Sequence, residues 1–238
     1  AAAVVGASGG LGAAFVEALS NAPGIVRVHA FSRSGRSPGG PAVLPGVLDL
    51  KDEASIEAAA ATIGDDPALR LIIVATGMLH DAACGHQPEK AWRDLTLDGF
   101  ARSFAINTTG PALIAKHFLP KIPRQGPSVF AALSARVGSV SDNKAGGWYS
   151  YRASKAALNQ VLKCLAIEEG RRRKGLTVVG LQPGTVDTGL SKPFQGFVKD
   201  DELFAPATSA AHLLEVLSRL TPAQSGTLLD WRGDAFAP

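Results

Sequence analysis

The feature that most constrains this chain is a glycine-rich turn near its beginning. An apolar run ending at Val5 leads into Gly6, glycines return at Gly10 and Gly12, and residues 13–20 then follow a helical pattern. A strand that passes through such a turn into a helix points backbone N–H groups at one place, where they can bind a pyrophosphate. The spacing is G-x-x-x-G-x-G, and an ordinary βα turn also uses glycine. The good flanking pattern leads us to favour nucleotide binding over that alternative.

Apolar runs and helical patterns alternate from this turn onward. After the first strand we expect strands at 25–31, 43–50, 69–75, 128–133, 176–181 and 227–229. The expected helices lie at 13–20, 52–63, 88–95, 97–119, 151–170 and 208–220. Strands that alternate with helices form a parallel sheet with helices on both faces. The sequence therefore predicts an α/β fold with a doubly wound, Rossmann-like parallel sheet of about seven strands in three α/β/α layers, built as a single domain over 1–238.

Two places depart from this regular pattern. Asn107 lies inside the expected helix 97–119, with Gly110 and Pro111 close behind, and such residues in mid-helix predict a kink or a functional purpose. The segment 188–205 has no regular period and is rich in apolar residues, namely Phe194, Phe197, Val198, Leu203 and Phe204. We expect this segment to be a substrate lid, although a loop that faces a partner would have a similar composition.

The residues that follow the second strand bear on the choice of cofactor. About 20 residues after the glycine turn, where a dinucleotide-binding fold reads the adenosine ribose, the chain has Ser32 and Arg33 and no carboxylate. A carboxylate would bind the 2′-hydroxyl of NAD, whereas an arginine suits a 2′-phosphate. A solvated arginine at a strand end is the other interpretation. The sequence favours NADP(H) over NAD(H).

The pair Tyr151 and Lys155 carries the candidate chemistry. Residues four apart on a helix project from the same face. A phenol is a poor acid or base at neutral pH, and a nearby ammonium would favour the phenolate and lower its pKa toward the working range. The pair alone is a weak signal, because any helix can carry it by chance. Together with the glycine turn it predicts an acid–base site beside a nucleotide.

Composition excludes several other classes of protein. The chain is 46% hydrophobic and 19% charged, as a globular enzyme is, and no apolar run approaches the roughly 20 residues of a membrane span. The initial apolar run lacks the basic region and the length of a signal peptide. The basic run 171–174 ends a helical pattern without interleaved aromatics, so we expect no nucleic-acid partner. Cys84 and Cys164 show no disulfide or metal spacing and the histidines form no pair. We therefore expect no metal and a reducing, cytoplasmic location.

Taken in order, these motifs resemble those of the short-chain dehydrogenase/reductase family, of the single-domain type. The resemblance covers nearly the whole chain and includes Asn107, Ser134 and the Pro183-Gly184 pair. Residues 134–139 and 147–155 look most like the C-factor and carbonyl-reductase branch.

The resemblance implies a role for each of four residues. Tyr151 would donate a proton to a carbonyl while NADPH delivers hydride, or accept one in the reverse direction. Lys155 would lower the tyrosine pKa and hold the nicotinamide ribose, Ser134 would hold the carbonyl oxygen, and Asn107 would position a water. The implied cofactor site consists of Gly6, Ser8, Gly10, Leu11, Gly12, Ser32, Arg33, Asp49, Leu50, Ala75, Thr76, Gly77, Lys155, Pro183, Gly184, Thr185, Val186 and Thr188. Within this set, Asp49 would meet the adenine, and the residues from Thr185 to Thr188 the carboxamide and phosphate.

The chain departs from the family pattern in two places. Where the family often has Asn-Asn-Ala-Gly, this chain has Val-Ala-Thr-Gly at 74–77. The second, catalytic serine of the usual pair falls on Ala135, which leaves Ser134 or Ser139, and we predict Ser134. Tyr149 points to another helix face than Tyr151 and is the weaker candidate for the acid. His80 and Asp81 follow the fourth strand and are interpreted as ordinary loop residues.

The sequence thus predicts an NADP-preferring carbonyl reductase or alcohol dehydrogenase that acts on a small, fairly apolar substrate. The alternative is a C-factor-like nucleotide-binding protein for signalling or redox sensing, with little turnover. Small residues on the helices of Asn107 and Tyr151 predict a homodimer or homotetramer, unless these alanines pack against their own sheet. They are Ala105, Ala112, Ala115, Ala153, Ala156 and Ala157.

Overall fold

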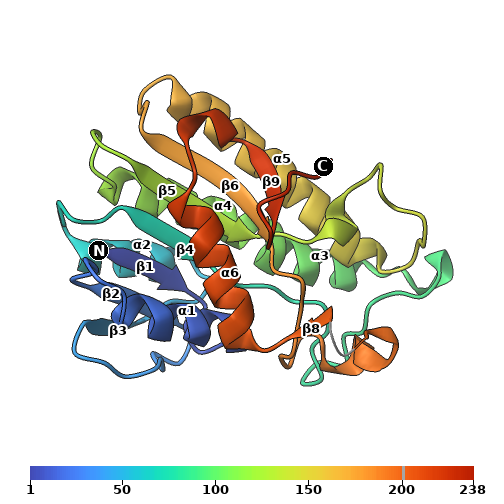
Figure 1. The fold of residues 1–238 in the computed structure, drawn as a ribbon. Coiled ribbons are helices and arrows are strands. Elements are labelled where there is room, and N and C mark those ends of the chain that lie inside the picture. Colours follow the sequence, from blue (N-terminus) through green and yellow to red (C-terminus); the bar gives the residue numbers. More distant parts are fainter. Residues whose placement is uncertain (200–201) are drawn as a thin grey trace.

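The apolar runs form one parallel sheet of seven strands in the computed structural model, which describes residues 1–199 and 202–238 (Figure 1). The strands are β1 (Ala2–Val5), β2 (Val28–Ser32), β3 (Val43–Val47), β4 (Leu71–Val74), β5 (Ser128–Leu133), β6 (Leu176–Gln182) and β9 (Thr227–Asp230). Their order is β3-β2-β1-β4-β5-β6-β9, and every neighbouring pair is parallel. The direction of winding therefore reverses between β1 and β4, where open α/β sheets bind their ligands.

Helices cover both faces of this sheet, so the predicted three-layer fold is confirmed. They are α1 (Gly10–Ser20), α2 (Glu53–Ile63), α3 (Leu97–Phe104), α4 (Gly110–Phe118), α5 (Tyr149–Gly170) and α6 (Pro206–Ser218). In Figure 1, α1 and α6 lie side by side in front of the sheet, and α2, α4 and α5 lie behind it. None of the helices in the described ranges is both long and apolar enough to cross a membrane.

The strands β1, β2, β4, β5 and β6 each contribute side chains to two separate hydrophobic cores, which explains their apolar runs. In β4, Ile72 and Val74 join the core beneath α2, α4 and α5, whereas Ile73 joins the core beneath α1 and α6. All three are at most 1% exposed.

The prediction of a helix at 88–95 is wrong. Only a single 3₁₀ turn, Trp92–Asp94, forms there. The reason is tertiary, because Glu89 is buried and serves the start of α5 instead. Its backbone oxygen accepts a hydrogen bond from the N–H of Trp148 at 2.5 Å, and its carboxylate accepts one from the N–H of Ser150 at 3.1 Å. These contacts to a distant segment outweigh a weak local helical pattern.

The expected helix 97–119 exists but changes its winding in the middle. Between α3 and α4 the five residues Ala105–Thr109 form a π-helical segment that contains Asn107. Such segments occur mostly as single wide turns within helices and often at functional sites. The local conflict seen in the sequence at this position therefore has a structural counterpart.

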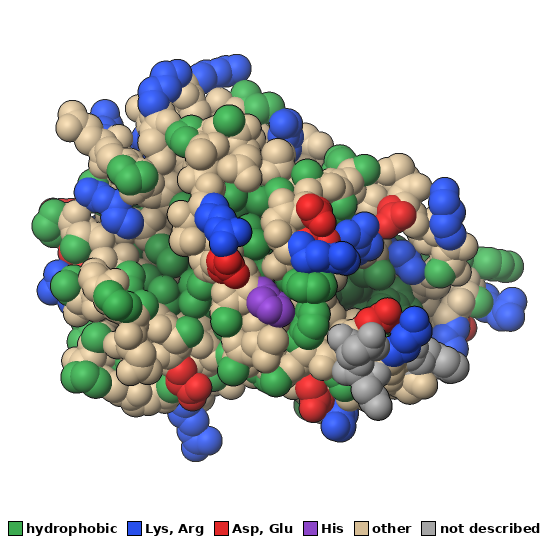
Figure 2. Space-filling view, viewed as in Figure 1, with side chains coloured by type: hydrophobic (Ala, Val, Ile, Leu, Met, Phe, Trp, Pro, Cys, Tyr) green, Lys and Arg blue, Asp and Glu red, His purple; other side chains and the backbone are tan. Residues whose placement is uncertain are grey.

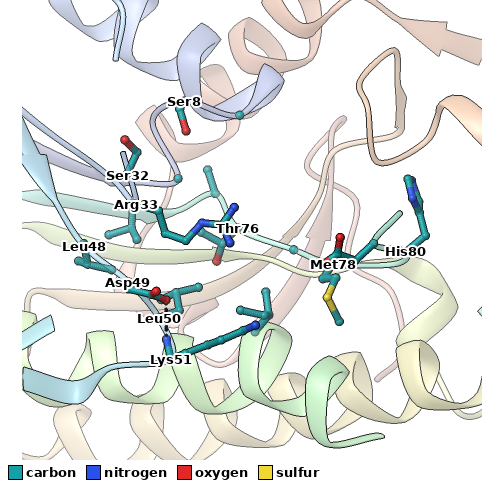
Figure 3. A pocket seen from close by; sticks show the side chains of 17 residues that line it. Ser8, Ser32, Arg33, Leu48, Asp49, Leu50, Lys51, Thr76, Met78 and His80 are labelled. Atoms are coloured by element: carbon teal, nitrogen blue, oxygen red, sulfur yellow. Dashed lines mark hydrogen bonds between the residues drawn. The ribbon is translucent and has the colours of Figure 1, made fainter. Parts of the chain in front are cut away.

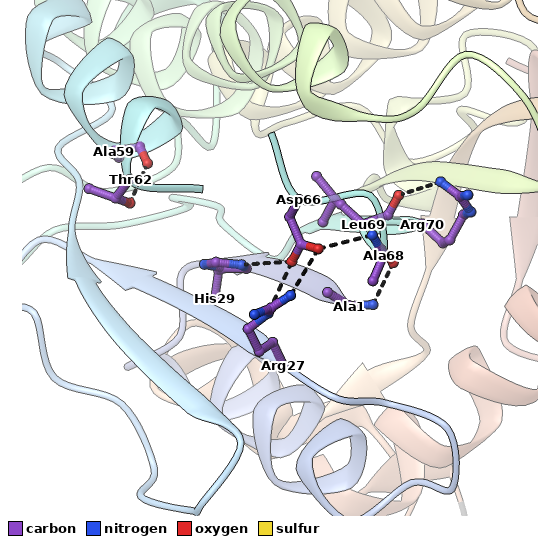
Figure 4. Close-up of polar contacts among 9 residues, drawn as sticks. All are labelled: Ala1, Arg27, His29, Ala59, Thr62, Asp66, Ala68, Leu69 and Arg70. Carbon is purple, nitrogen blue, oxygen red and sulfur yellow. Dashed lines mark hydrogen bonds and ion pairs between the residues drawn. The ribbon is translucent and has the colours of Figure 1, made fainter. Parts of the chain in front are cut away.

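An ion pair between the half-exposed Arg27 and the buried Asp66 fastens the amino-terminal edge of the sheet, away from the glycine turn (Figure 4). Arg27 donates two hydrogen bonds of 3.1 Å to the carboxylate of Asp66, which also accepts one from the N–H of Ala68. Burial alone would raise the pKa of Asp66, but these donors outweigh it and hold that pKa below its usual value. Burial lowers the pKa of the neighbouring His29. The cluster ties the start of β2 to the loop before β4.

Candidate active site

A cleft of about 410 Å³ lies at the carboxyl ends of β1, β2, β3 and β4 (Figure 3). It is lined by Val5, Gly6, Ser8, Gly9, Ser32, Arg33, Leu48, Asp49, Leu50, Lys51, Ala75, Thr76, Gly77, Met78, His80, Asp81 and Ile106. The cleft thus occupies the point where the winding of the sheet reverses, as expected for a dinucleotide site.

The glycine turn at one wall of the cleft requires glycine for close packing. Gly6 has a φ of +95°, and a Cβ there would lie 2.8 Å from the oxygen of Ala75. A Cβ on Gly12 would lie 2.0 Å from the oxygen of Gly6, which no side chain can tolerate. Among the described residues no side chain caps the first turn of α1. Its N–H groups are therefore available to an anion.

Two cations stand at the other end of the cleft. Figure 3 shows Arg33 reaching across toward Thr76, with Lys51 on the opposite side beside Asp49. The carboxylate of Asp49 accepts a hydrogen bond of 3.0 Å from the N–H of Lys51. In the described part of the chain neither Arg33 nor Lys51 forms an ion pair. This end can therefore receive a group with more than one negative charge.

Half of the predicted cofactor residues line this cleft. They are Gly6, Ser8, Ser32, Arg33, Asp49, Leu50, Ala75, Thr76 and Gly77. The other nine do not line it, namely Gly10, Leu11, Gly12, Lys155, Pro183, Gly184, Thr185, Val186 and Thr188. Leu11 and Val186 are buried in the core beneath α1 and α6. Thr188 stays close to the turn, since a Cβ on Gly10 would lie 2.7 Å from its methyl group.

Sequence reasoning missed several lining residues, among them Lys51, Met78, His80 and Ile106. Lys51 could have been found from the sequence, because it follows the predicted Asp49-Leu50 pair by one residue. Met78 directly follows the predicted Gly77, and His80, interpreted from the sequence as an ordinary loop residue, lies two residues further on. Ile106 directly precedes the predicted Asn107 and reaches the cleft from the π-helical segment.

Tyr151 and Lys155 lie together on the buried face of α5. Their exposed fractions are 7% and 2%. The Lys155 Nζ lies over the tyrosine ring, 5.9 Å from its centroid, and donates a hydrogen bond of 2.7 Å to the backbone oxygen of Leu133. A Cβ on Gly77 would come within 3.7 Å of this Nζ. The lysine therefore reaches the end of the cleft at Gly77.

Burial shifts both pKa values away from their ordinary values. It raises the pKa of Tyr151 to about 12 and lowers the pKa of Lys155 to about 8. The expected net lowering of the tyrosine pKa is not found, because burial of the phenol raises it. The ammonium is hydrogen-bonded to Leu133, and burial penalises the phenolate. At neutral pH the phenol therefore keeps its proton and can donate it in a hydrogen bond.

Asn107 connects the cleft to α5. It is fully buried, and its Oδ1 accepts a hydrogen bond of 2.8 Å from the N–H of Met78. Its Nδ2 donates to the oxygen of Met78 at 2.9 Å and to the hydroxyl of Ser154 at 3.0 Å. The side-chain amide therefore fixes the residue after Gly77 against the residue before Lys155. Its predicted contact with a water stays a prediction.

The candidate serines are held inside the protein. The hydroxyl of Ser134 donates a hydrogen bond of 2.6 Å to Oδ1 of Asn159, one helical turn beyond Lys155. The hydroxyl of Ser139 donates to the oxygen of Pro238 at 3.3 Å and accepts from the N–H of Asp142 at 3.2 Å. Neither serine is hydrogen-bonded to Tyr151. Ser134 therefore fastens the end of β5 to α5, and its predicted contact with a carbonyl oxygen has no counterpart in these bonds.

The predicted lid segment approaches the site from the side of β6. Thr185–Val186 (β7) pairs in parallel with Leu203–Phe204 (β8), and Lys192–Phe197 forms a 3₁₀ helix between them. A Cβ on Gly77 would lie 3.5 Å from the Leu190 side chain. Asp200 and Asp201, which the predicted lid includes, lie outside the described residues.

A doubly wound parallel sheet with a glycine-lined cleft at its reversal point defines the class of dinucleotide-binding domains. Residues 1–197 match the family model described as short chain dehydrogenase, and the chain belongs to the short-chain dehydrogenase/reductase family. It is therefore an oxidoreductase of a family that binds NAD or NADP.

Similar proteins include both enzymes and a signal protein. The chain is 32% identical to 1-hydroxy-2-glutathionyl-2-methyl-3-butene dehydrogenase of Rhodococcus sp. (strain AD45), over 96% of this chain and 98% of that one. It is 34% identical to the C-signal of Myxococcus xanthus, over 59% of this chain and 79% of that one. The crystal structure of NADPH-bound carbonyl reductase from chicken fatty liver superposes with a TM-score of 0.82 at 29% identity, covering 100% of this chain and 98% of that chain.

Proposed function

We propose that this protein is an NADPH-dependent carbonyl reductase that interconverts a small carbonyl compound and its alcohol, with Tyr151 as the proton donor. The observation that carries the proposal is the buried pair of Tyr151 and Lys155, which meets the nucleotide cleft at Gly77. The chicken relative is an NADPH-bound carbonyl reductase, and the name of the Rhodococcus relative describes a dehydrogenase of a hydroxy compound. We further propose a homodimer or homotetramer.

The residues of the cleft fit the dinucleotide. The open turn from Gly6 to Gly12 and the uncapped start of α1 would hold the pyrophosphate. Arg33 and Lys51 would hold a 2′-phosphate, which NADPH has and NADH lacks. Lys155 would reach the nicotinamide ribose past Gly77. When bound, NADPH supplies the hydride for carbonyl reduction.

Side chains of the protein itself donate the proton and stabilise the negative charge that forms when the proton leaves. The Tyr151 hydroxyl, protonated at neutral pH because its pKa is about 12, donates its hydrogen to the carbonyl oxygen. Below pH 8 the Lys155 ammonium places a positive charge beside the phenolate that forms when the proton leaves. Asn107 holds Met78 and Ser154 in place around this pair. Because both groups are buried, their interaction is screened by little water.

Replacing Tyr151 by Phe tests the proposal directly. This change keeps the ring and removes the transferable proton. Turnover should therefore fall by about 10²- to 10⁴-fold, as when a general acid is lost, while NADPH binding survives. Steady-state NADPH oxidation with a carbonyl substrate measures turnover, and NADPH fluorescence measures binding. The control is Tyr149→Phe, because Tyr149 is 36% exposed and lies outside the buried face. Wild-type turnover in Tyr151→Phe would refute the proposed mechanism.

The similarity to the C-signal supports a second candidate, a nucleotide-binding signalling or redox-sensing protein with little turnover. This candidate predicts NADPH binding without oxidation of NADPH by any member of a broad panel of aldehydes and ketones. A reductase oxidises NADPH with some members of the panel and loses this activity in Tyr151→Phe. The same two measurements therefore separate the candidates.

A further inference from the structure

Trp148, directly before α5, has an unusual backbone conformation. Among the described residues it is the only one other than glycine with a positive φ, at 51°. This left-handed region is unfavourable for a bulky side chain and suits glycine, which occupies the two preceding positions, 146 and 147. Strained residues persist where the surrounding structure holds them, and they concentrate at functional sites. The backbone conformation of Trp148 therefore points to a functional role for its side chain.

The surrounding structure does hold Trp148. Its N–H donates to the backbone oxygen of the buried Glu89 at 2.5 Å. The guanidinium of Arg152 donates to the backbone oxygens of Gly146 at 3.2 Å, Gly147 at 3.0 Å and Val137 at 3.2 Å. Both ends of the loop before α5 are thus tied to the helix that carries Tyr151. These contacts fix the backbone from which the indole projects.

The indole faces the proposed proton donor. Its ring centroid lies 6.3 Å from that of Tyr151, with the planes at 79°, and 5.1 Å from that of Phe194, with the planes at 65°. Phe194 in turn lies 5.8 Å from His80, which lines the cleft. An aromatic row therefore runs past Tyr151 from the start of α5 to the loop after β4. Figure 2 shows the surface hollowed between β8 and the loop before α5, with hydrophobic side chains at the floor.

We propose that Trp148 and Phe194 form a substrate subsite that selects carbonyl compounds bearing an aromatic ring next to the carbonyl group. This inference rests on the proposed function, because it places the carbonyl oxygen at the hydroxyl of Tyr151. A substituent on that carbonyl then lies within ring-to-ring distance of Trp148, which is only half-buried and keeps part of its surface open. An aromatic pair gains an edge-to-face or offset contact that a saturated ring of similar size does not.

The expected selectivity can be stated as a ratio. One aromatic pair contributes a factor of roughly 2 to 13 beyond the area it buries. With two aromatic partners, the wild-type protein should favour acetophenone over cyclohexyl methyl ketone by about 10-fold in kcat/KM. Trp148→Leu should reduce this ratio to about 1 to 3, whereas Trp148→Phe should largely keep it. Most of the change should appear in KM, because the contact is present before the chemical step.

Two further variants make the experiment decisive. Trp92→Leu is the matched control, because Trp92 is 70% exposed, and its selectivity should equal that of the wild type. Trp148→Gly accepts the positive φ and removes the ring, so it tests the subsite even if Trp148→Leu fails to fold. A second readout is quenching of tryptophan fluorescence by acetophenone with NADP⁺ present. The Trp92→Leu protein should keep it and the Trp148 variants should lose it.

The outcomes separate this inference from the proposed function. Equal selectivity in the wild type, Trp148→Leu and Trp148→Gly would overturn the subsite and leave the carbonyl reductase standing. If no ketone or aldehyde is reduced although NADPH binds, the proposed function fails. In that case fluorescence quenching lost in Trp148→Gly still supports an aromatic subsite, and quenching unchanged in that variant overturns it.

Discussion

Replacing Lys155 by Met should stabilise the fold at neutral pH while it abolishes activity. Lys155 is 2% exposed, and burial lowers its pKa from the usual 10.5 to about 8. At pH 7 Lys155 is therefore charged in the folded protein, and its buried ammonium lowers the free energy of unfolding. A pKa shift of this size corresponds to about 3 kcal/mol. Met removes this cost and fills a similar volume. It also removes the hydrogen bond to the oxygen of Leu133, which costs about 1–3 kcal/mol. The net gain at pH 7 is about 0–2 kcal/mol.

The pH dependence isolates the lysine from every other effect of the substitution. The pKa of Lys155 is lower in the folded state, so between about pH 8 and pH 10.5 the unfolded chain binds more protons. The wild-type free energy of unfolding therefore rises with pH through this window, by about 2 kcal/mol from Lys155 alone between pH 7 and pH 9.5. Lys155→Met lacks this rise. Its stability relative to the wild type should consequently fall by about 2 kcal/mol over the same interval.

Urea unfolding at pH 7 and at pH 9.5 measures this difference. The matched control is Lys163→Met on the same helix, because Lys163 is exposed and should show no such pH-dependent difference from the wild type. Turnover should be lost in Lys155→Met and kept in Lys163→Met. If the stability difference between Lys155→Met and the wild type is the same at both pH values, the buried ammonium assigned to Lys155 is wrong.

Two other predictions concern the cofactor and the assembly. Arg33→Asp should weaken NADPH binding by about 10- to 100-fold, because it removes a charge-assisted contact, and NADH binding should be unchanged or improved. Arg36→Asp is the control, since Arg36 is also exposed. Equal losses of affinity for both cofactors would contradict the role of Arg33. Light scattering at micromolar concentration should show a homodimer or homotetramer. The interface would contain half-buried alanines such as Ala112 and Ala153. A monomer would show instead that these alanines pack within their own chain, as the buried Ala115 does.

The sequence was sufficient for the fold because the elements that build it are strongly patterned. The run 69–75 is apolar throughout, and the structure buries β4 between two cores. Errors arose where a local pattern was weak and distant contacts decided the outcome. The segment 88–95 reads as helix, yet the backbone of Glu89 bonds to Trp148, about 60 residues away in sequence, and no local pattern reveals that contact.

The sequence predicted which residues belong to the candidate site better than it predicted which atoms those residues contact. The glycine spacing located one wall of the cleft, and Arg33 was found by counting from the turn. The contact of Ser134 was not foreseen, because spacing cannot show that Asn159 reaches the end of β5. Asn107 lies between these cases. Its unfavourable position in a helix indicated a special role. Only the structure shows that its side chain forms hydrogen bonds with Met78 and Ser154.

The direction of the pKa shifts of Tyr151 and Lys155 could not be predicted, because it depends on burial. The sequence pattern of α5 does not show which of its faces is buried. Polar residues recur along one side of α5 at Tyr151, Ser154, Lys155 and Asn159, as on a solvated face, yet all four are at most 7% exposed. Three of them are bonded to the strand ends or to the π-helical segment: Ser154 to Asn107, Lys155 to Leu133 and Asn159 to Ser134. A buried polar face costs stability that an apolar face would not. In α5 the same burial keeps the Tyr151 phenol protonated at neutral pH and lowers the pKa of Lys155 to about 8, so the face of the helix that costs stability is also the face that carries the proposed acid and its neighbouring charge.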